Sequence, residues 1–158
     1  MREDEWPAFV EVGKRQYAAD MVENGGMTPQ AAAEKAEQDF AGLLPEGLAT
    51  EGHFIYAIED AETGSPVGRL WFAVREVWGE SVAFLYDVYL EESVRGRGLG
   101  KQAMLLLEEE ARARGLTRVS LNVFGGNTVA RSLYRALGYA ENAVWMSKAL
   151  SSAPASPI

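Results

Sequence analysis

Residues 95–101, a glycine-rich run between a predicted strand and a predicted long helix, constrain the fold of this chain more than any other segment. Glycines on alternate positions leave backbone N–H groups uncovered, and the helix that begins here adds unpaired N–H groups and the positive end of its dipole. Such a site binds an anion, most often a phosphate. Arg95, Arg97 and Lys101 add positive charge in a chain whose formal net charge is -8. The plainer alternative is a flexible turn with solvated arginines.

The apolar periodicity around this run predicts an alternation of helices and strands. We predict helices over 4–24, 28–44, 101–114 and 128–137, and strands over 54–58, 66–74, 82–90, 119–123 and 143–150. Strand 82–90, helix 101–114 and strand 119–123 form a βαβ unit, which requires a parallel pair. The fold class is therefore α/β (α+β), in the order αα-βββ-α-β-α-β, with a mixed, mostly antiparallel central sheet. The expected helix caps are Asp4 and Thr28, and the expected core face of helix 101–114 is Met104, Leu105, Leu107 and Ala111.

The composition restricts the classes of protein to which this chain can belong. Its 158 residues predict one domain over 1–150, followed by a disordered tail over 151–158. The absence of cysteine excludes disulfides and thiol nucleophiles. A charged N-terminus and the lack of a long apolar run lead us to expect a cytoplasmic protein with no membrane span. The acidic balance disfavours a nucleic-acid partner and suits a cationic one, although it serves solubility equally well.

Two common phosphate-binding motifs fit the glycine run poorly. A Walker A loop would need glycine at Arg95 and a hydroxyl side chain at Gln102. A dinucleotide fingerprint matches residues 98–103 on paper, but it should follow its strand at once and be answered by an acidic residue at the end of the next strand. That strand offers Asn122 instead. A nucleotide-dependent oxidoreductase is therefore a weak alternative.

Residues 95–100 match the pattern Arg/Gln-x-x-Gly-x-Gly/Ala, and with them the chain resembles the GNAT family of N-acetyltransferases. The resemblance extends through 121–127 and through 130–139, which is similar to the family's Ala-x-x-Leu-Tyr-x-x-x-Gly-Phe/Tyr block. It implies a GNAT-like three-layer fold, with a helical hairpin at 1–45 on the acceptor side and a coenzyme A core at 82–148. It also implies acetyl-CoA as co-substrate, an amine acceptor and no metal. The sequence leaves room for a homodimer.

The resemblance implies roles for individual residues. The loop would hold the coenzyme's pyrophosphate on its backbone, a splayed core strand would hold pantetheine, a backbone N–H near Val88 would polarise the acetyl carbonyl, and Tyr134 would act as general acid. Asn127 is equally well explained as the cap of the helix that follows it. The implied coenzyme-binding residues are Val88, Tyr89, Leu90, Arg95, Gly96, Arg97, Gly98, Leu99, Gly100, Lys101, Asn127 and Tyr134, and the implied catalytic residues are Tyr134 and Val88.

The general base and the acceptor stay open. Asn122 and Phe84 occupy positions where relatives carry an acid, and strand alternation places Asp87 on the face opposite Tyr86 and Val88. The only histidine, His53, is read as structural. Aromatic residues such as Trp71 and Tyr86 either enclose an acceptor or belong to the core. The leading hypothesis is direct transfer of acetyl from acetyl-CoA to a primary amine, and the alternative is a module that binds acyl-CoA without turnover.

Overall fold

The computed structural model describes residues 1–148. Within these residues it contains four α-helices, four strands and three short 3₁₀ turns. Their bounds are α1 Trp6–Gly25, α2 Pro29–Leu43, β1 His53–Glu59, β2 Pro66–Val77, β3 Glu80–Leu90, α3 Leu99–Ala113, β4 Val119–Leu121 and α4 Thr128–Ala136. None of these helices is both long and apolar enough to cross a bilayer.

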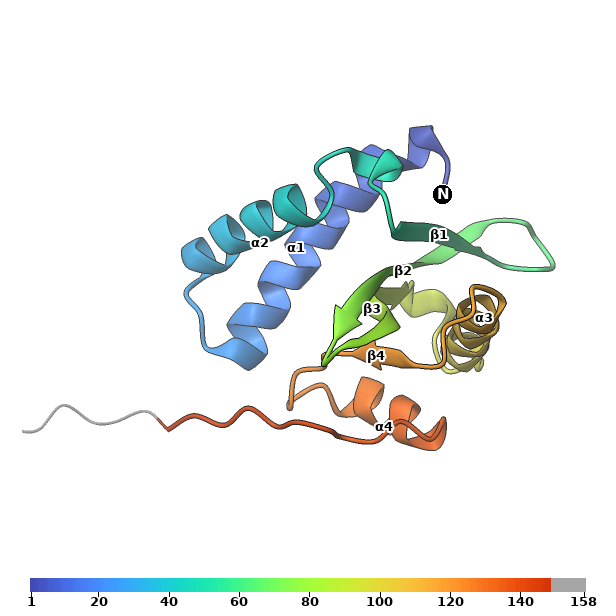
Figure 1. The fold of residues 1–158 in the computed structure, drawn as a ribbon. Helices are drawn as coiled ribbons and strands as arrows, with labels where there is room; N and C mark the ends of the chain where they lie inside the picture. Colours follow the sequence, from blue (N-terminus) through green and yellow to red (C-terminus); the bar gives the residue numbers. More distant parts are fainter. Residues whose placement is uncertain (149–158) are drawn as a thin grey trace, which may run out of the picture.

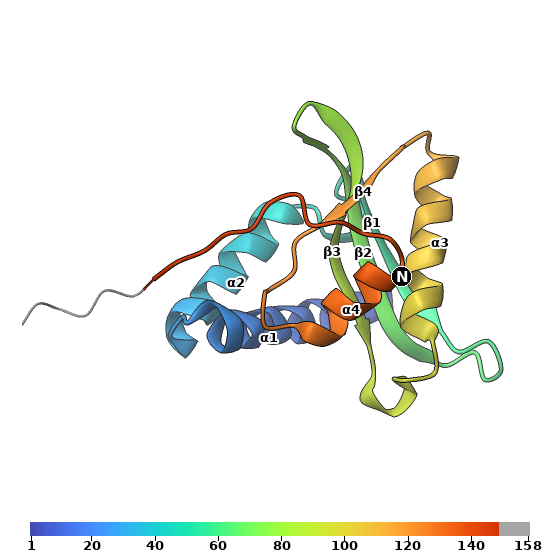
Figure 2. The ribbon, with the colours of Figure 1, turned by 90° about the horizontal axis from the view of Figure 1, so that it is seen from below.

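The strands form one mixed sheet between two layers of helices (Figures 1 and 2). Its order is β1-β2-β3-β4, with the first two pairings antiparallel and the last parallel. One face packs against α1 and α2, and the other packs against α3 and α4. The predicted fold class, including the parallel βαβ unit, is confirmed.

Two local features form the second helix of the hairpin: a capped N-terminus and a buried stripe of mostly small side chains. The Thr28 hydroxyl accepts a hydrogen bond from the Ala31 N–H, and Pro29 occupies the first turn of α2, as predicted. The predicted cap at Asp4 is wrong. Asp4 belongs to a 3₁₀ turn, and α1 begins only at Trp6. The apolar stripe of α2 is buried at Ala32, Ala36 and Phe40.

The main core lies between the sheet and α3. Phe72 and Met104 are fully buried there, and the aromatic rings of Phe54 and Phe72 stack at 5.0 Å between centroids. The predicted core face of α3 is right except at Leu105, which is 41 % exposed. Ala103 is buried instead. The apolar stripe therefore lies slightly to one side of the position that the sequence pattern indicated.

The predicted last strand is not formed over residues 143–148. These residues form no strand pairing and are exposed, and residues 149 and 150 lie outside the described part of the chain. The segment leaves α4 and runs away from the body of the protein (Figure 1). Its apolar pattern is typical of a strand, but no neighbouring strand of residues 1–148 pairs with it.

Strand β3 carries one inserted residue opposite β2. Trp71 pairs with Asp87 and Phe72 pairs with Leu85, so Tyr86 has no partner on β2. Such a bulge shifts the alternation of side chains and increases the local twist. Beyond it the two strands approach closely, because a Cβ at Gly68 would lie 2.3 Å from the Tyr89 carbonyl oxygen.

Gly68→Ala should therefore destabilise the protein by about 1–3 kcal/mol, since the added methyl group would push β2 away from the backbone of β3. Urea unfolding followed by circular dichroism measures this. The control is Gly42→Ala, at a position in α2 where a Cβ meets nothing within 4 Å. That change should be neutral or stabilise by up to about 1 kcal/mol. Equal effects of the two substitutions would contradict the close approach.

Candidate functional site

Strands β3 and β4 separate halfway along β3. Their ladder pairs Ala83 with Val119, Phe84 with Ser120 and Leu85 with Leu121, and it ends there. Strand β3 continues to Leu90 with only β2 beside it. Residues 86–90 therefore present one unpaired backbone edge within the described part of the chain. Unpaired strand edges are ready to accept another extended chain or an extended ligand.

The direction of the peptide groups along this edge follows from one hydrogen bond. The Glu91 N–H donates to the Val67 carbonyl oxygen of β2 at 2.9 Å. Because successive peptide groups of a strand point to opposite sides, the N–H groups of Val88 and Leu90 point away from β2. These are the backbone groups for which the family resemblance implies bonds to a ligand.

The edge of β3 leads directly into the glycine run. Gly96 and Gly98 have φ angles of 76° and 81°, a conformation that few other residues adopt without strain. A Cβ at either position would meet no atom within 4 Å, so the space beside this backbone is open. Helix α3 begins at Leu99 without a side-chain cap. Its first N–H groups and its dipole therefore face this open space.

The three cations of the run differ in their partners. The Arg95 Nε donates to the Leu90 carbonyl oxygen at 2.9 Å, which ties the loop to the end of β3. One guanidinium nitrogen of Arg97 lies 3.6 Å from an Asp60 carboxylate oxygen. Lys101 is exposed in the first turn of α3, and no ion pair holds it within residues 1–148. Only Lys101 is therefore left to neutralise a ligand without giving up a protein contact.

Helix α4 brings Tyr134 into the core beside this edge. Tyr134 is 9 % exposed and packs in the same apolar cluster as Val88. Gly100, in the first turn of α3, lies close to both elements. A Cβ there would lie 3.4 Å from the Leu133 side chain of α4 and 3.7 Å from the Leu90 side chain of β3. The end of β3, the start of α3 and the middle of α4 therefore meet at one place.

Asn127 lies at the N-terminus of α4 and is exposed. Its side-chain oxygen accepts a hydrogen bond from the Ala130 N–H at 3.0 Å, so it caps the helix as the sequence predicts. Asn122 is also exposed, one residue beyond the end of β4. The coenzyme contact that the resemblance implies for Asn127 stays a prediction.

Asp87 lies on the face opposite Val88, as predicted, but the prediction that it lies opposite Tyr86 is wrong. The inserted Tyr86 cancels the alternation, so Tyr86 and Asp87 both lie on the α1 side of the sheet. There the Asp87 carboxylate accepts a hydrogen bond from the Arg69 Nε at 2.5 Å. Arg69 is buried and also donates to Gln16 of α1. No pattern in the strand sequence marks the insertion, which becomes visible only when β3 is paired with β2.

Burial and nearby charges raise the pKa values of Asp87 and of two groups around it, Tyr134 and Asp20. Burial raises the pKa of Asp87, and the Arg69 guanidinium offsets this in part. Burial, and then the negative charge of Asp87, raises the pKa of Tyr134 to about 12. Desolvation, followed by the charges of Asp87 and Glu23, raises the pKa of Asp20 on α1. The charge of Asp87 therefore acts on groups of two helices, Asp20 of α1 and Tyr134 of α4.

The aromatic residues proposed for the acceptor side are mostly packed against one another. Trp71 is 3 % exposed, stacks on Tyr86 with ring centroids 4.7 Å apart and donates through its indole N–H to His53. Trp71 is therefore a core residue. His53 accepts this bond at Nδ1, and its ring stacks on Tyr86. These two contacts fix the orientation of the imidazole ring and give His53 a structural role.

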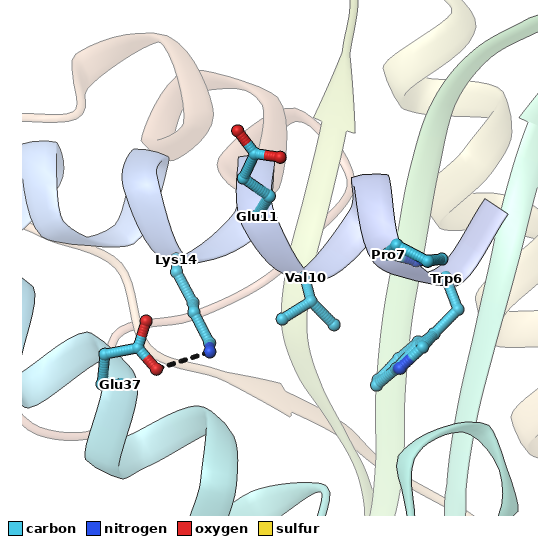
Figure 3. A pocket seen from close by; sticks show the side chains of 6 residues that line it. All are labelled: Trp6, Pro7, Val10, Glu11, Lys14 and Glu37. Carbon is cyan, nitrogen blue, oxygen red and sulfur yellow. Dashed lines mark hydrogen bonds and ion pairs between the residues drawn. The ribbon is translucent and has the colours of Figure 1, made fainter.

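A separate, open hollow of about 500 Å³ lies on the hairpin (Figure 3). The ammonium group of Lys14 on α1 lies 2.6 Å from Glu37 of α2 across it. None of its lining residues belongs to the sheet, the glycine run or α4.

Among residues 1–148, no group of three or more His, Asp or Glu side chains is arranged to hold a metal ion.

Comparisons with known proteins identify the class. Residues 3–139 match the model of the acetyltransferase (GNAT) family, so the chain belongs to this family, whose members use acetyl-CoA. It is 36 % identical to YycN of Bacillus subtilis (strain 168), an uncharacterized N-acetyltransferase, over 95 % of this chain and 96 % of that one. It is 33 % identical to YdgE of the same organism, also an uncharacterized N-acetyltransferase, over 95 % of both chains.

Solved structures agree with the fold. The crystal structure of YycN superposes with a TM-score of 0.89 over 96 % of both chains. A GCN5-related N-acetyltransferase from Ralstonia eutropha JMP134, at 23 % identity, superposes with a TM-score of 0.68 over 90 % of this chain and 93 % of that one. The second likeness concerns the fold alone. The acetyltransferase class that the sequence predicted is confirmed.

Proposed function

We propose that this protein transfers the acetyl group of acetyl-CoA directly to a primary amine, with the coenzyme lying along the free edge of β3. The observation that carries the proposal is the continuity of that edge with the glycine run. An extended pantetheine arm could bond to the backbone of Val88 and Leu90, while the diphosphate reached the N–H groups at the start of α3. Lys101 would add a positive charge beside it.

The chemical step follows from these positions. The N–H of Val88 would donate to the acetyl carbonyl oxygen, on which negative charge develops as the amine attacks. The tetrahedral intermediate would then break its C–S bond, and the Tyr134 hydroxyl would donate a proton or a hydrogen bond to the departing thiolate. With a pKa of about 12, Tyr134 keeps its proton over the whole physiological range. The chain has no cysteine, so no thioester with the enzyme is involved.

The acceptor would approach from the α1 side of the sheet. Asp87 is 30 % exposed at its side chain, and its charge acts on both Tyr134 and Asp20. A cationic amine would gain from this field, and its proton could pass to the carboxylate before attack. These carboxylates support a positively charged acceptor over a neutral one.

Gly98→Val should raise the Kd for acetyl-CoA about tenfold or more, because a branched side chain would occupy the space that a phosphate needs. Calorimetric titration measures this. Gly138→Val is the matched control, since Gly138 has a φ of 90° and equally open surroundings at the far end of α4. Both variants should lose similar stability, and only the first should lose affinity. Unchanged affinity in Gly98→Val would rule out the loop as the phosphate site.

Tyr134→Phe should lower kcat by about 10²–10⁴ while the Kd for acetyl-CoA changes little, because only the proton donor is removed. A thiol-release assay with a panel of amines provides the rate. In the unmodified protein, no limb of the pH–rate profile below about pH 11 should come from Tyr134, given its raised pKa. A rate equal to that of the unmodified protein would remove the general-acid role. Silence of both proteins on every amine would favour the binding module instead.

Asp87→Asn should raise the KM for a cationic acceptor about tenfold and leave acetyl-CoA affinity unchanged. Because the pKa of Asp87 is raised, the unmodified protein should lose kcat/KM as the pH falls through a value above the usual aspartate range, and the variant should lack this limb. Glu80→Gln is the control, since it also removes an acid of β3 that pairs with an arginine. The same KM effect in both variants would sink the assignment.

A further inference from the structure

Strand β2 buries one charged side chain beside the free edge of β3. Arg69 is 7 % exposed, and among residues 1–148 only one other charged residue, Asp60, is buried. A guanidinium keeps its proton under all ordinary conditions, so its burial costs free energy unless its donors are paired. A well-packed apolar side chain would often stabilise such a position as well or better. Arg69 is therefore a candidate for a role other than stability.

The contacts of Arg69 join β2 to two other elements. Its Nε donates to the Asp87 carboxylate of β3 at 2.5 Å, and a terminal nitrogen donates to the Gln16 side chain of α1. Its guanidinium carbon lies 4.6 Å from the centroid of the Tyr89 ring and 5.7 Å from that of Phe9 of α1. At these distances a cation is attracted to an aromatic ring. The side chain therefore holds two residues of β3 against α1.

The two residues that Arg69 holds on β3, Asp87 and Tyr89, are the chain neighbours of Val88, whose N–H points away from β2. A strand inside a sheet normally has hydrogen bonds on both edges, and these fix the direction of each peptide group. Val88 has a ladder on one side only within residues 1–148. The contacts of Arg69 to the two flanking side chains supply a second restraint where the second ladder is missing.

This restraint continues from Tyr89 to the glycine run. The guanidinium carbon of Arg95 lies 5.5 Å from the centroid of the Tyr89 ring, and the Arg95 Nε donates to the Leu90 carbonyl oxygen at 2.9 Å. The Tyr89 ring therefore contacts one arginine from β2 and one from the run. Through this ring, α1 is connected to the free edge of β3 and to the start of the run.

We propose that Arg69 is a positioning residue for acetyl transfer, which holds Asp87 and Tyr89 and thereby fixes the direction of the Val88 N–H. This role rests on the proposed function, in which that N–H donates to the acetyl carbonyl oxygen. Such donors are effective only when they already point at the place where negative charge develops. A misplacement of about 1 Å can lower a rate about 10²-fold. Arg69 need not contact either substrate, since it acts through its two neighbours on β3.

Arg69→Met should lower kcat about 10- to 100-fold in the thiol-release assay, because methionine keeps an apolar stem but holds neither neighbour. The Kd for acetyl-CoA should change less than about threefold, since the bond from Arg95 to Leu90 still holds the glycine run. Arg69→Lys should lower kcat to a similar extent, because one ammonium group keeps the charge but cannot replace the two-ended guanidinium.

Arg75→Met is the matched control and should keep the kcat of the unmodified protein. Arg75 also belongs to β2, donates to the Tyr86 hydroxyl and lies 4.5 Å from the centroid of the Phe84 ring. It differs from Arg69 in being exposed and in pairing with Val82, far from the free edge.

A second measurement needs no turnover. Residual dipolar couplings and ¹⁵N relaxation of the protein without ligand give the direction and the order of individual N–H groups. In Arg69→Met, the coupling of Val88 should change, and its order parameter should fall from about 0.85 to below about 0.6. Residues 83–85, which are paired on both sides, should keep their values. Arg75→Met should change neither set.

Two results would overturn the positioning role. One is an unchanged coupling and order parameter of Val88 in Arg69→Met, or in Arg69→Lys if circular dichroism shows that the methionine variant does not fold. The other is an unmodified kcat in Arg69→Lys, because charge alone would then suffice. Absence of turnover in every protein would contradict the proposed function instead, and the couplings would still decide whether Arg69 holds Val88.

Discussion

The backbone of β3 from Tyr86 to Leu90 is held by hydrogen bonds on one side only, and the candidate site depends on this. Buried peptide groups normally pair with another strand, so an edge left open inside a fold is costly unless something else occupies it. The inserted Tyr86 bends the strand at the point where β4 ends. The free N–H groups of β3, the glycine run and the uncapped start of α3 then follow one another directly along the chain.

The same insertion explains the electrostatics of the site. By placing Asp87 on the α1 side, it brings a carboxylate beside the buried Arg69. The pKa of Tyr134 is raised mainly by burial, and the charge of Asp87 raises it further. The buried Arg69 guanidinium would be strongly destabilising without a partner, and the half-buried Asp87 carboxylate supplies one while keeping its charge. One extra residue in a strand therefore provides both the opening for an extended ligand and the charge on the opposite side of it.

The order of elements was readable in advance because each one carries a local signal. Thr28-Pro29 begins α2, Gly115 and Gly138 follow α3 and α4 with left-handed φ angles, and the periodicity changes from two to about 3.6 where strand gives way to helix. The predictions were wrong at one helix boundary and at one residue of a helix face. The start of α1 lies beyond Asp4 because a 3₁₀ turn precedes it, and Leu105 turns outward because the sheet covers a narrower stripe of α3 than its apolar residues could fill.

By itself, the sequence determined the fold class, the glycine run at 95–101 before a helix and the place of Tyr134 within a helix, because these depend on residue type and on spacing within one segment. Tertiary structure alone decided the face on which Asp87 lies, the length of β3 left unpaired and the fate of the apolar segment after α4. Each of these is a relation between segments that are distant along the chain. A strand's pattern of residues specifies which faces are apolar, but it does not specify where its partner stops or whether a residue is inserted opposite it.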